Sequence, residues 1–337
     1  MKKVLSIVLA LVLVLGLVAC GGGGEDTNTD ATYKLGLGVS MSLKATDASE
    51  DADGNAQQDG TAAAVILDAE GKIVACKIDV AQNKMAFTAT GEVLNKDTEF
   101  VTKKVKEFDY GMAPVSTLEE GEWFQQIAKF EEYVIGMTAD EVAAIETVLS
   151  NGHMVPVDEA LLAGCTMQIT DFQAAIVDAC NKAVDCGAGS NLALGIVSDM
   201  ASSTDASEDA DGVAFSTSTY AAYASDDEGV ITGAYIDCTQ AKIAVTADGK
   251  GIAPESVTTK KDLKEAYGMG PVSPLEEGEW YQQIAAFEAY IVGMTADEVG
   301  AMELVESNGH MVSTDEALLA GCTMDISDFV AAVAAAI

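Results

Sequence analysis

Arginine is absent from this 337-residue chain, and only two histidines are present, His153 and His310. All 18 basic residues are therefore Lys, against 54 Asp and Glu, and the formal net charge is −36. Nucleic acids are bound by clustered Lys and Arg, so this balance argues against a nucleic acid as partner. Because only two imidazoles are present, we expect neither a His-rich metal site nor a Ser-His-Asp hydrolase. We expect a protein that is not an enzyme and has no metal site.

Cysteine is also scarce, although the chain is not short of apolar residues. Hydrophobic residues make up 49% of the sequence, which is enough to bury substantial cores, and the length fits about two domains at roughly 150 residues each. Beyond Cys20 there are too few cysteines for a disulfide scaffold. Cys180 and Cys186 lie close together near an expected helix end, so they either pair or remain buried free thiols.

The first 19 residues are predicted to be a lipoprotein signal peptide. Two Lys precede an apolar run over residues 4–18, which is about 15 residues long and too short for a bilayer span. The run ends in Leu-Val-Ala-Cys20, which resembles a bacterial lipobox whose Cys is lipidated. We expect residues 20–32 to form a flexible tether. The lipid on Cys20 would then anchor the protein at the extracellular face of the bacterial cell membrane.

The remainder of the sequence repeats itself. Residues 46–54 recur unchanged at 204–212, and residues 118–142 recur at 275–299 with 20 of 25 positions identical. A period near 157 residues is too long for a solenoid, so we expect a tandem duplication of a whole domain. The predicted organisation is a first repeat at 33–185, a linker at 186–189 and a second repeat at 190–337.

Each repeat is predicted to be an α+β domain in which an antiparallel sheet precedes the helices. In the first repeat the β-type runs are residues 35–43, 63–67, 73–78 and 85–89, with a hairpin turn at 68–71 and a last strand at 165–169. Because each repeat has its own helices and apolar faces, we expect the two repeats to fold independently.

Helix starts are indicated by capping signals. Capping-box patterns begin at Ser116, Ser273 and Thr138, and Thr170 is the expected N-cap of a last helix over 171–184. Helical spacing predicts one buried face, made by Trp123, Ile127, Phe130 and Val134.

Three features of the sequence are candidate sites. The acidic loop ending at Gly54 resembles a calcium loop, but the end positions of the EF-hand pattern fall on Ser49 and Gly60, which favours a solvated inter-strand loop. Trp123 and Trp280 suit either ligand stacking or the core, and their helical spacing favours the core. His153 and His310 follow Asn-Gly in an expected turn, where histidines are usually solvated.

The segment 160–166, repeated at 317–323, is the most informative. It predicts a turn of small residues that presents Thr166, or Thr323, close to a helix N-terminus. Backbone N–H groups and the helix dipole favour a phosphate at such a place without any Arg.

The order of features in each repeat resembles the FMN-binding domain of membrane-anchored Gram-positive lipoproteins, in particular the duplicated lipoproteins of flavin-based extracellular electron transfer. The resemblance covers nearly all of both repeats and is carried by Tyr110-Gly-Met112, Gly121-Glu-Trp123, residues 133–141 and Gly164-Cys-Thr166, and by their counterparts Tyr267-Gly-Met269, Gly278-Glu-Trp280, residues 290–298 and Gly321-Cys-Thr323.

In that family a flavin transferase attaches FMN through its phosphate to a Thr hydroxyl. The resemblance implies Thr166 and Thr323 as acceptors, with Gly164 and Gly321 as the motif glycines. It also implies a flavin transferase and a membrane redox partner. The sequence departs from the family motif at three positions of each repeat. Ala160 and Ala317 stand where the motif has Asp, Ala163 and Ala320 where it has Ser or Thr, and Cys165 and Cys322 where it has Ala or Ser.

Three functions follow as alternatives. The first is a surface-tethered flavin-based electron carrier. The second is a cofactor-free binding or structural module of the same fold. The third, a substrate-binding lipoprotein that feeds a transporter, fits the anchor but not the duplication.

Overall fold

The computed structural model describes residues 32–98 and 100–337. Cys20, the predicted signal peptide and nearly all of the predicted tether lie outside these residues. The described residues belong to one compact unit with the predicted α+β composition and antiparallel sheets. None of the helices in this part of the chain is long and apolar enough to cross a bilayer.

The elements of the two halves follow one another in a similar order. The first half contains β1 (Lys34–Thr46), β2 (Gly54–Leu67), β3 (Ile73–Phe87), α1 (Lys103–Lys106), η1 (Glu107–Tyr110), η2 (Ala113–Val115), α2 (Trp123–Tyr133), α3 (Ala139–Ala143), β4 (Thr147–Ser150), β5 (His153–Pro156), α4 (Glu159–Leu162), α5 (Thr170–Lys182) and β6 (Val184–Asp185). The second half contains β7 (Asn191–Asp199), β8 (Gly212–Ser225), β9 (Ile231–Val245), β10 (Gly251–Ile252), α6 (Lys260–Leu263), η3 (Lys264–Tyr267), η4 (Gly270–Val272), α7 (Trp280–Ile291), α8 (Ala296–Gly300), β11 (Leu304–Ser307), β12 (His310–Ser313), α9 (Glu316–Leu319) and α10 (Ser327–Ala334).

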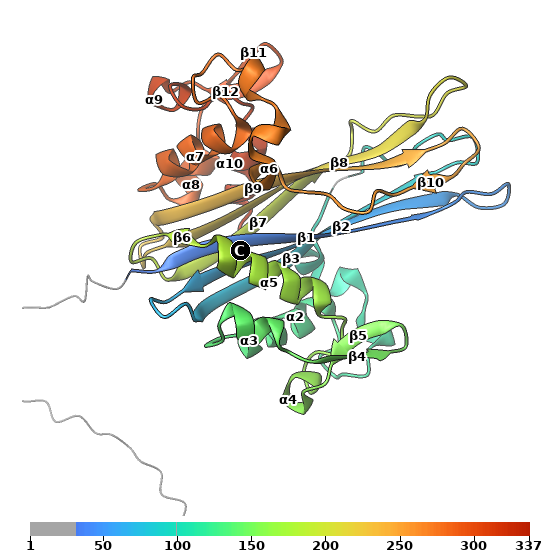
Figure 1. Ribbon diagram of the computed structural model, residues 1–337, viewed down its shortest axis with the longest axis horizontal. Helices are drawn as coiled ribbons and strands as arrows, with labels where there is room; N and C mark the ends of the chain where they lie inside the picture. Colours follow the sequence, from blue (N-terminus) through green and yellow to red (C-terminus); the bar gives the residue numbers. More distant parts are fainter. Residues whose placement is uncertain (1–31, 99) are drawn as a thin grey trace, which may run out of the picture. The chain divides into compact units, whose positions relative to one another are not determined.

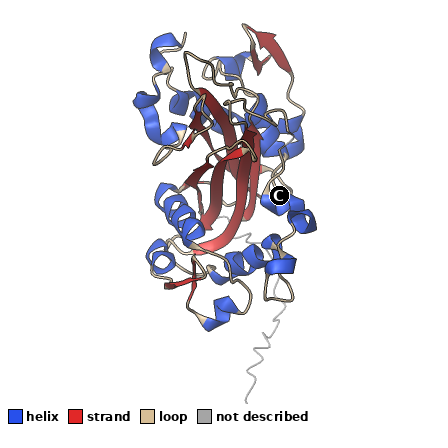
Figure 2. Ribbon diagram, turned by 90° about the vertical axis from the view of Figure 1, so that its right-hand side faces the viewer, coloured by secondary structure: helices blue, strands red, loops and turns tan. Residues whose placement is uncertain are grey.

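Two four-stranded antiparallel sheets lie at the centre, with helices outside them (Figure 2). The strand order is β3-β2-β1-β6 in the first sheet and β10-β9-β8-β7 in the second. Each sheet is covered on one face by helices of its own half, α2 and α5 in the first and α7 and α10 in the second (Figure 1). The remaining faces share two apolar clusters that take residues from both halves. The layers are therefore helix, sheet, sheet and helix.

Glycines in the strands allow the last helix of each half to lie directly on its sheet. A Cβ on Gly36 in β1 would lie 1.9 Å from the carbonyl oxygen of Ala179 in α5. A Cβ on Gly195 in β7 would lie equally close, 1.9 Å, to the carbonyl oxygen of Ala332 in α10. Glycine is needed at both positions because the helix backbone occupies the space of a side chain.

A largely buried ion pair lies beside β3 in the first sheet and beside β9 in the second. Glu131 accepts a hydrogen bond from the Ile78 N–H at 2.6 Å and pairs with Lys104 at 2.6 Å. Glu288 makes the matching contacts with β9 and pairs with Lys261 at 2.5 Å. Unpaired N–H groups on a strand edge are a template for aggregation, so these pairs protect the sheets.

Polar side chains also connect the two sheets. Gln58 is completely buried, donates from Nε2 to the Ala214 carbonyl oxygen at 2.8 Å, and accepts a hydrogen bond from the Ser216 hydroxyl at Oε1. Separating the halves would expose this contact together with the shared apolar clusters. The two halves therefore share a common core within one compact unit, and independent folding of each repeat stays a prediction.

Three strand predictions are wrong. The run 63–67 is the end of a longer strand, β2, which begins at Gly54. The run 73–78 and residues 85–87 of the next run belong to one strand, β3, because the polar residues between them stay paired with β2. Residues 165–169 form no strand. The Cys165 N–H bonds to the Leu161 carbonyl oxygen and the Thr166 N–H to the Gln126 side chain, so neither donor is available to a neighbouring strand.

The predicted buried face of α2 is confirmed, but some of the predicted N-cap residues are wrong. The predicted face of α2 is buried, and the Thr138 capping box with Glu141 is present. Helices α2 and α7 begin after Glu122 and Glu279, which cap them, rather than at Ser116 and Ser273. Ser116 instead accepts hydrogen bonds from Leu118 N–H and Gln126 Nε2. The last helix of the first half starts at Thr170, with Ile169 in the N-cap position.

Candidate functional site

Thr166, the predicted acceptor, lies in a short turn between α4 and α5. The Asp158 side chain caps α4 by accepting hydrogen bonds from two backbone N–H groups at 2.9 and 3.0 Å. After one helical turn the Cys165 N–H returns to the Leu161 carbonyl oxygen at 2.8 Å, and Thr166 comes to lie beside α2. The second half has an Asp-capped turn of the same kind before Thr323.

A buried glutamine holds each threonine. Gln126 Oε1 accepts hydrogen bonds from the Thr166 N–H at 2.9 Å and from its hydroxyl at 3.3 Å. Gln126 Nε2 donates to a backbone carbonyl oxygen at 2.9 Å and to the Ser116 hydroxyl at 3.2 Å, so both ends of the amide are fixed. Gln283 binds Thr323 at the same distances, 2.9 and 3.3 Å. The two halves thus present a half-buried Thr hydroxyl in one geometry.

Gly164 and Gly321 are needed for packing against the helix that carries this glutamine. A Cβ on Gly164 would lie 2.7 Å from Lys129 Cγ, and one on Gly321 would lie 2.7 Å from Ala286 Cβ. A cavity of about 310 Å³ adjoins Gly164 and is lined by Lys129, Glu132, Tyr133, Ala160, Leu161, Ala163 and Gly164. Thr166 follows Gly164 by two positions in the chain and is not among these lining residues.

A lysine of α1 lies over the ring of Trp123, which is one helical turn before Gln126 in α2. Lys103 Nζ is 5.3 Å from the centroid of the Tyr110 ring and 5.8 Å from that of Trp123, the first residue of α2. Lys260 lies over the matching Tyr and Trp of the second half at 4.9 and 5.5 Å. Cation–π contacts of this kind contribute about 0.5–1 kcal/mol at exposed sites and more when desolvated.

A carboxyl group at the start of α5 completes the site. Burial raises the pKa of Asp171, and the nearby Lys44 and Lys103 partly offset this rise. Burial likewise raises the pKa of Asp328 in the second half. The neighbouring Phe172 ring packs edge-on against Trp123 with centroids 6.1 Å apart. The Trp123 ring therefore contacts both Lys103 and the first turn of α5.

These groups suit holding a ligand better than cleaving a bond. Burial raises the pKa of the thiols of Cys165 and Cys322 to about 11, so they stay protonated at neutral pH and are poor nucleophiles. Trp123 and Trp280 are each 3% exposed and belong to the core, as their spacing favoured. All six described cysteines, Cys180 and Cys186 included, are free thiols.

The remaining candidates lie elsewhere. His153 and His310 are exposed and follow Asn-Gly turns with positive φ at both turn residues, as the sequence predicted. The acidic loop over residues 47–53 connects β1 to β2, which confirms its place between strands. Within residues 32–98 and 100–337, no group of three or more His, Cys, Asp or Glu is arranged to hold a metal ion.

Gln126, Lys103 and their counterparts, Gln283 and Lys260, were not predicted from the sequence. A signal was available for the lysine, because Thr102-Lys103-Lys104 recurs as Thr259-Lys260-Lys261 in a chain that has few basic residues. The glutamine repeats too, but its role depends on a contact across 40 residues, which sequence spacing does not reveal.

Comparison with known proteins gives this chain no relative: no family model matches it, and neither a curated protein nor a solved structure is similar to it.

Proposed function

We propose that the protein is a membrane-anchored extracellular lipoprotein with two tandem FMN-binding-like domains, at residues 33–185 and 190–337, and that it carries electrons on FMN joined to Thr166 and Thr323. The observation that supports this most is the duplicated Thr–Gln contact, with the same distances in both halves and a lysine stacked on Tyr and Trp one turn away. FMN, when bound, supplies reversible electron transfer.

The residues present suit an ester-linked flavin. The new bond would join Thr Oγ1 to the FMN phosphorus, and the hydroxyl proton and one phosphate oxygen with its proton would leave, in net, as water. Gln126 would keep the Thr166 N–H at 2.9 Å, so esterification gives up only the longer 3.3 Å hydrogen bond. Lys103 lies over the ring of Trp123, the first residue of α2, and the Lys129 side chain lies beside Gly164, so both lysines would favour a phosphate in this acidic chain.

A cofactor-free module of the same fold is the second candidate. It is favoured by the hydrogen bonds of Gln126, which are complete without any ligand, and by Ala160, Ala163 and Cys165 at positions where the family motif has other residues. In this case each Thr–Gln contact fixes the turn to its helix and has no further role.

Denaturing gels decide between the two candidates. The protein is co-expressed with a flavin transferase, boiled in detergent and examined for flavin fluorescence. We expect a fluorescent band for the wild type and for Thr166→Ser/Thr323→Ser, which keeps both hydroxyls, and a dark band for Thr166→Val/Thr323→Val, which keeps the shape and loses them. A dark wild-type band at normal protein yield would contradict covalent flavin and favour the cofactor-free module.

The anchor is tested separately by Cys20→Ser. We expect the variant to be lost from the membrane fraction, either released into the medium or left unprocessed, while the wild type stays membrane-bound. Processed, membrane-bound Cys20→Ser protein would contradict the lipid anchor.

A further inference from the structure

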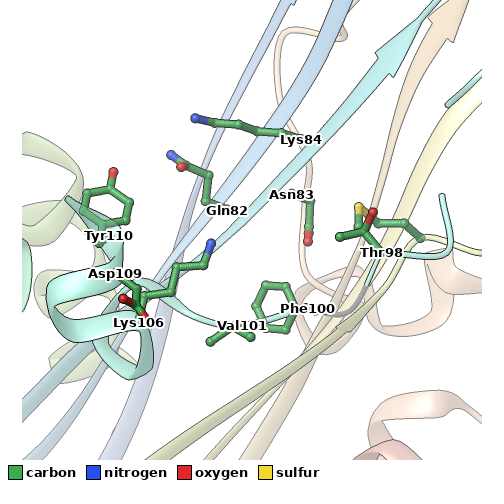
Figure 3. Close-up of a pocket in the computed structure, with 10 residues that line it drawn as sticks. Gln82, Asn83, Lys84, Thr98, Phe100, Val101, Lys106, Asp109 and Tyr110 are labelled. Carbon is green, nitrogen blue, oxygen red and sulfur yellow. The ribbon is translucent and has the colours of Figure 1, made fainter. Parts of the chain in front are cut away.

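A second cavity, of about 340 Å³, lies at the open edge of β3 (Figure 3). It is lined by Gln82, Asn83, Lys84, Thr98, Phe100, Val101, Lys106, Asp109, Tyr110 and Met200. This volume falls in the range of small-molecule sites. Among the residues of the candidate site described above, Tyr110 is the one that also lines this cavity, so the two places are adjacent but distinct.

The amide of Asn83 is buried with one end satisfied and the other unpaired. Asn83 is 2% exposed, and its Nδ2 donates to the Ser198 hydroxyl at 3.0 Å and the Ser218 hydroxyl at 3.3 Å. Ser198 donates to the Thr217 carbonyl oxygen at 3.1 Å, and its oxygen lies 2.8 Å from that of Ser218. Both hydroxyl protons are therefore donated to other oxygen atoms, so the two hydroxyl oxygens can only accept from Asn83. The Asn83 atom that faces them is therefore the amide nitrogen, and Oδ1 is left without a partner.

Asn83 Oδ1 has no hydrogen-bond partner among the described residues. Buried acceptors in proteins are nearly always paired, so an unpaired one that lines a cavity marks a place for a donor from a ligand. In Figure 3 the oxygen end of Asn83 points into the space beside Phe100 and Thr98.

The rest of the lining selects the shape and charge of such a ligand. Phe100, Val101 and Met200 give apolar walls that suit a flat ring. In Figure 3 the amino group of Lys84 lies on the Tyr110 side of the cavity, and that of Lys106 lies between Tyr110 and Asn83. Among the described lining residues these two lysines outnumber the carboxylates, of which there is one, Asp109, so this side favours an acidic group.

We propose that this cavity binds a small planar heteroaromatic anion, with its ring N–H donating to Asn83 Oδ1 and its acidic group between Lys84 and Lys106. The site does not depend on flavin attachment at Thr166, because neither Thr166 nor Gln126 belongs to its lining.

The second half provides natural substitutions at the key positions. At the offset of the repeat, Asn83 corresponds to Ala241, Lys106 to Leu263 and Asp109 to Ala266, whereas Lys84 corresponds to another lysine, Lys242. The proposed site therefore belongs to the first half, and the chain itself supplies the matched variants Asn83→Ala and Lys106→Leu.

Calorimetry with two probes tests the proposal on the purified full chain, expressed without a flavin transferase. Indole-3-acetate has a flat ring, an N–H donor and a carboxylate, and 1-methylindole-3-acetate lacks only the donor. We expect saturable one-to-one binding of indole-3-acetate and about tenfold weaker binding of the methylated probe, because Asn83 Oδ1 would again be left unpaired.

The variants separate the two ends of the site. Asn83→Ala should remove the preference between the probes, and Lys106→Leu should weaken both equally without removing the preference. Lys84→Ala should weaken both probes, while its counterpart Lys242→Ala should change neither. Absence of binding, or equal binding of the two probes by the wild type, would overturn the proposal, and this wild-type comparison does not depend on the folding of any variant.

Discussion

Helices α2 and α7 carry the same glutamine and differ on their exposed sides. Gln126 and Gln283 hold their threonines at equal distances, 2.9 and 3.3 Å. The first half has Lys129 and Glu132 beside this contact, where the second has Ala286 and Ala289. What the halves share is the buried hydrogen bonding that places the hydroxyl, and what differs is the charge around it. Any difference in ligand attachment between the halves should therefore come from charge.

The protected sheet edges give a second contrast. Lys104 and Lys261 pair with their glutamates in the same way, but Lys261 Nζ also lies 3.6 Å from the centroid of the Tyr235 ring. The position of Tyr235 is taken by Lys77 in the first half. The ion pair is thus packed under an aromatic ring in only one of the two halves.

The largest expected effect comes from filling the space between helix and sheet. Gly36→Ala and Gly195→Ala should each lower the free energy of unfolding by about 3 kcal/mol, because the new Cβ meets a backbone oxygen that cannot rotate away. Urea denaturation measures both. Gly71→Ala is the control, since its Cβ meets nothing within 4 Å and only the φ of +77° is strained. Unchanged midpoints for both strand variants would contradict the helix–strand contact.

Removal of the edge carboxylates should come next. Glu131→Ala and Glu288→Ala should each cost about 3 kcal/mol, because each leaves a half-buried lysine and a strand N–H without a partner. The adjacent Glu132→Ala is the matched control. Its ion pair with Lys129 is exposed and 3.8 Å long, so the loss should stay below about 0.5 kcal/mol. Equal losses for Glu131→Ala and Glu132→Ala would refute the edge-protecting role.

The pH dependence of stability should follow the buried aspartates. Burial raises the pKa of Asp79 and of Asp237 in the folded state above the unfolded value of about 3.9. The folded state therefore binds protons more tightly, and this stabilisation is lost as the pH rises through the raised pKa. We expect a higher melting temperature at pH 5 than at pH 8.

Asn variants make this assignment specific. Asp79→Asn and Asp237→Asn should each flatten the melting-temperature profile between pH 5 and pH 8, while Asp248→Asn, at an exposed position with a lowered pKa, should leave the slope unchanged. A profile that rises toward pH 8, or Asn variants with the wild-type slope, would contradict the assignment.

The smallest effect should come from the threonines themselves. Thr166→Val and Thr323→Val should each lower the free energy of unfolding by about 0.5–1 kcal/mol, because the glutamine keeps the backbone N–H and loses only the longer hydrogen bond. Thermal denaturation of the unmodified protein measures both, with Thr138→Val as a capping-box comparison. Unequal losses in the two halves would contradict the equivalence of the two contacts.

The sequence predicted those features that depend on local pattern. The α+β class, the buried face of α2 and the Thr138 capping box follow from periodicity and from short-range hydrogen bonding. The start of α2 was misplaced because Ser116 looks like a cap but binds Leu118 and Gln126 instead. The continuous strand β3 was missed because the polar residues in its middle resemble a break.

The candidate site was predictable only in part. Thr166 and Gly164 were predicted from the family motif and stay candidates, whereas the contacts of Gln126 and Lys103 form only after folding. Sharing of one core by the two sheets was likewise invisible, because each half already looked complete by itself. Gln58 and Ser216, which join the sheets, lie 158 residues apart.

Covalent flavin on the two threonines is measured by the intact mass after co-expression with a flavin transferase. We expect the wild type to gain two increments, each of one FMN less one water, Thr166→Val or Thr323→Val to gain one, and the double variant to gain none. An unmodified wild-type mass, or increments that persist in the double variant, would contradict it.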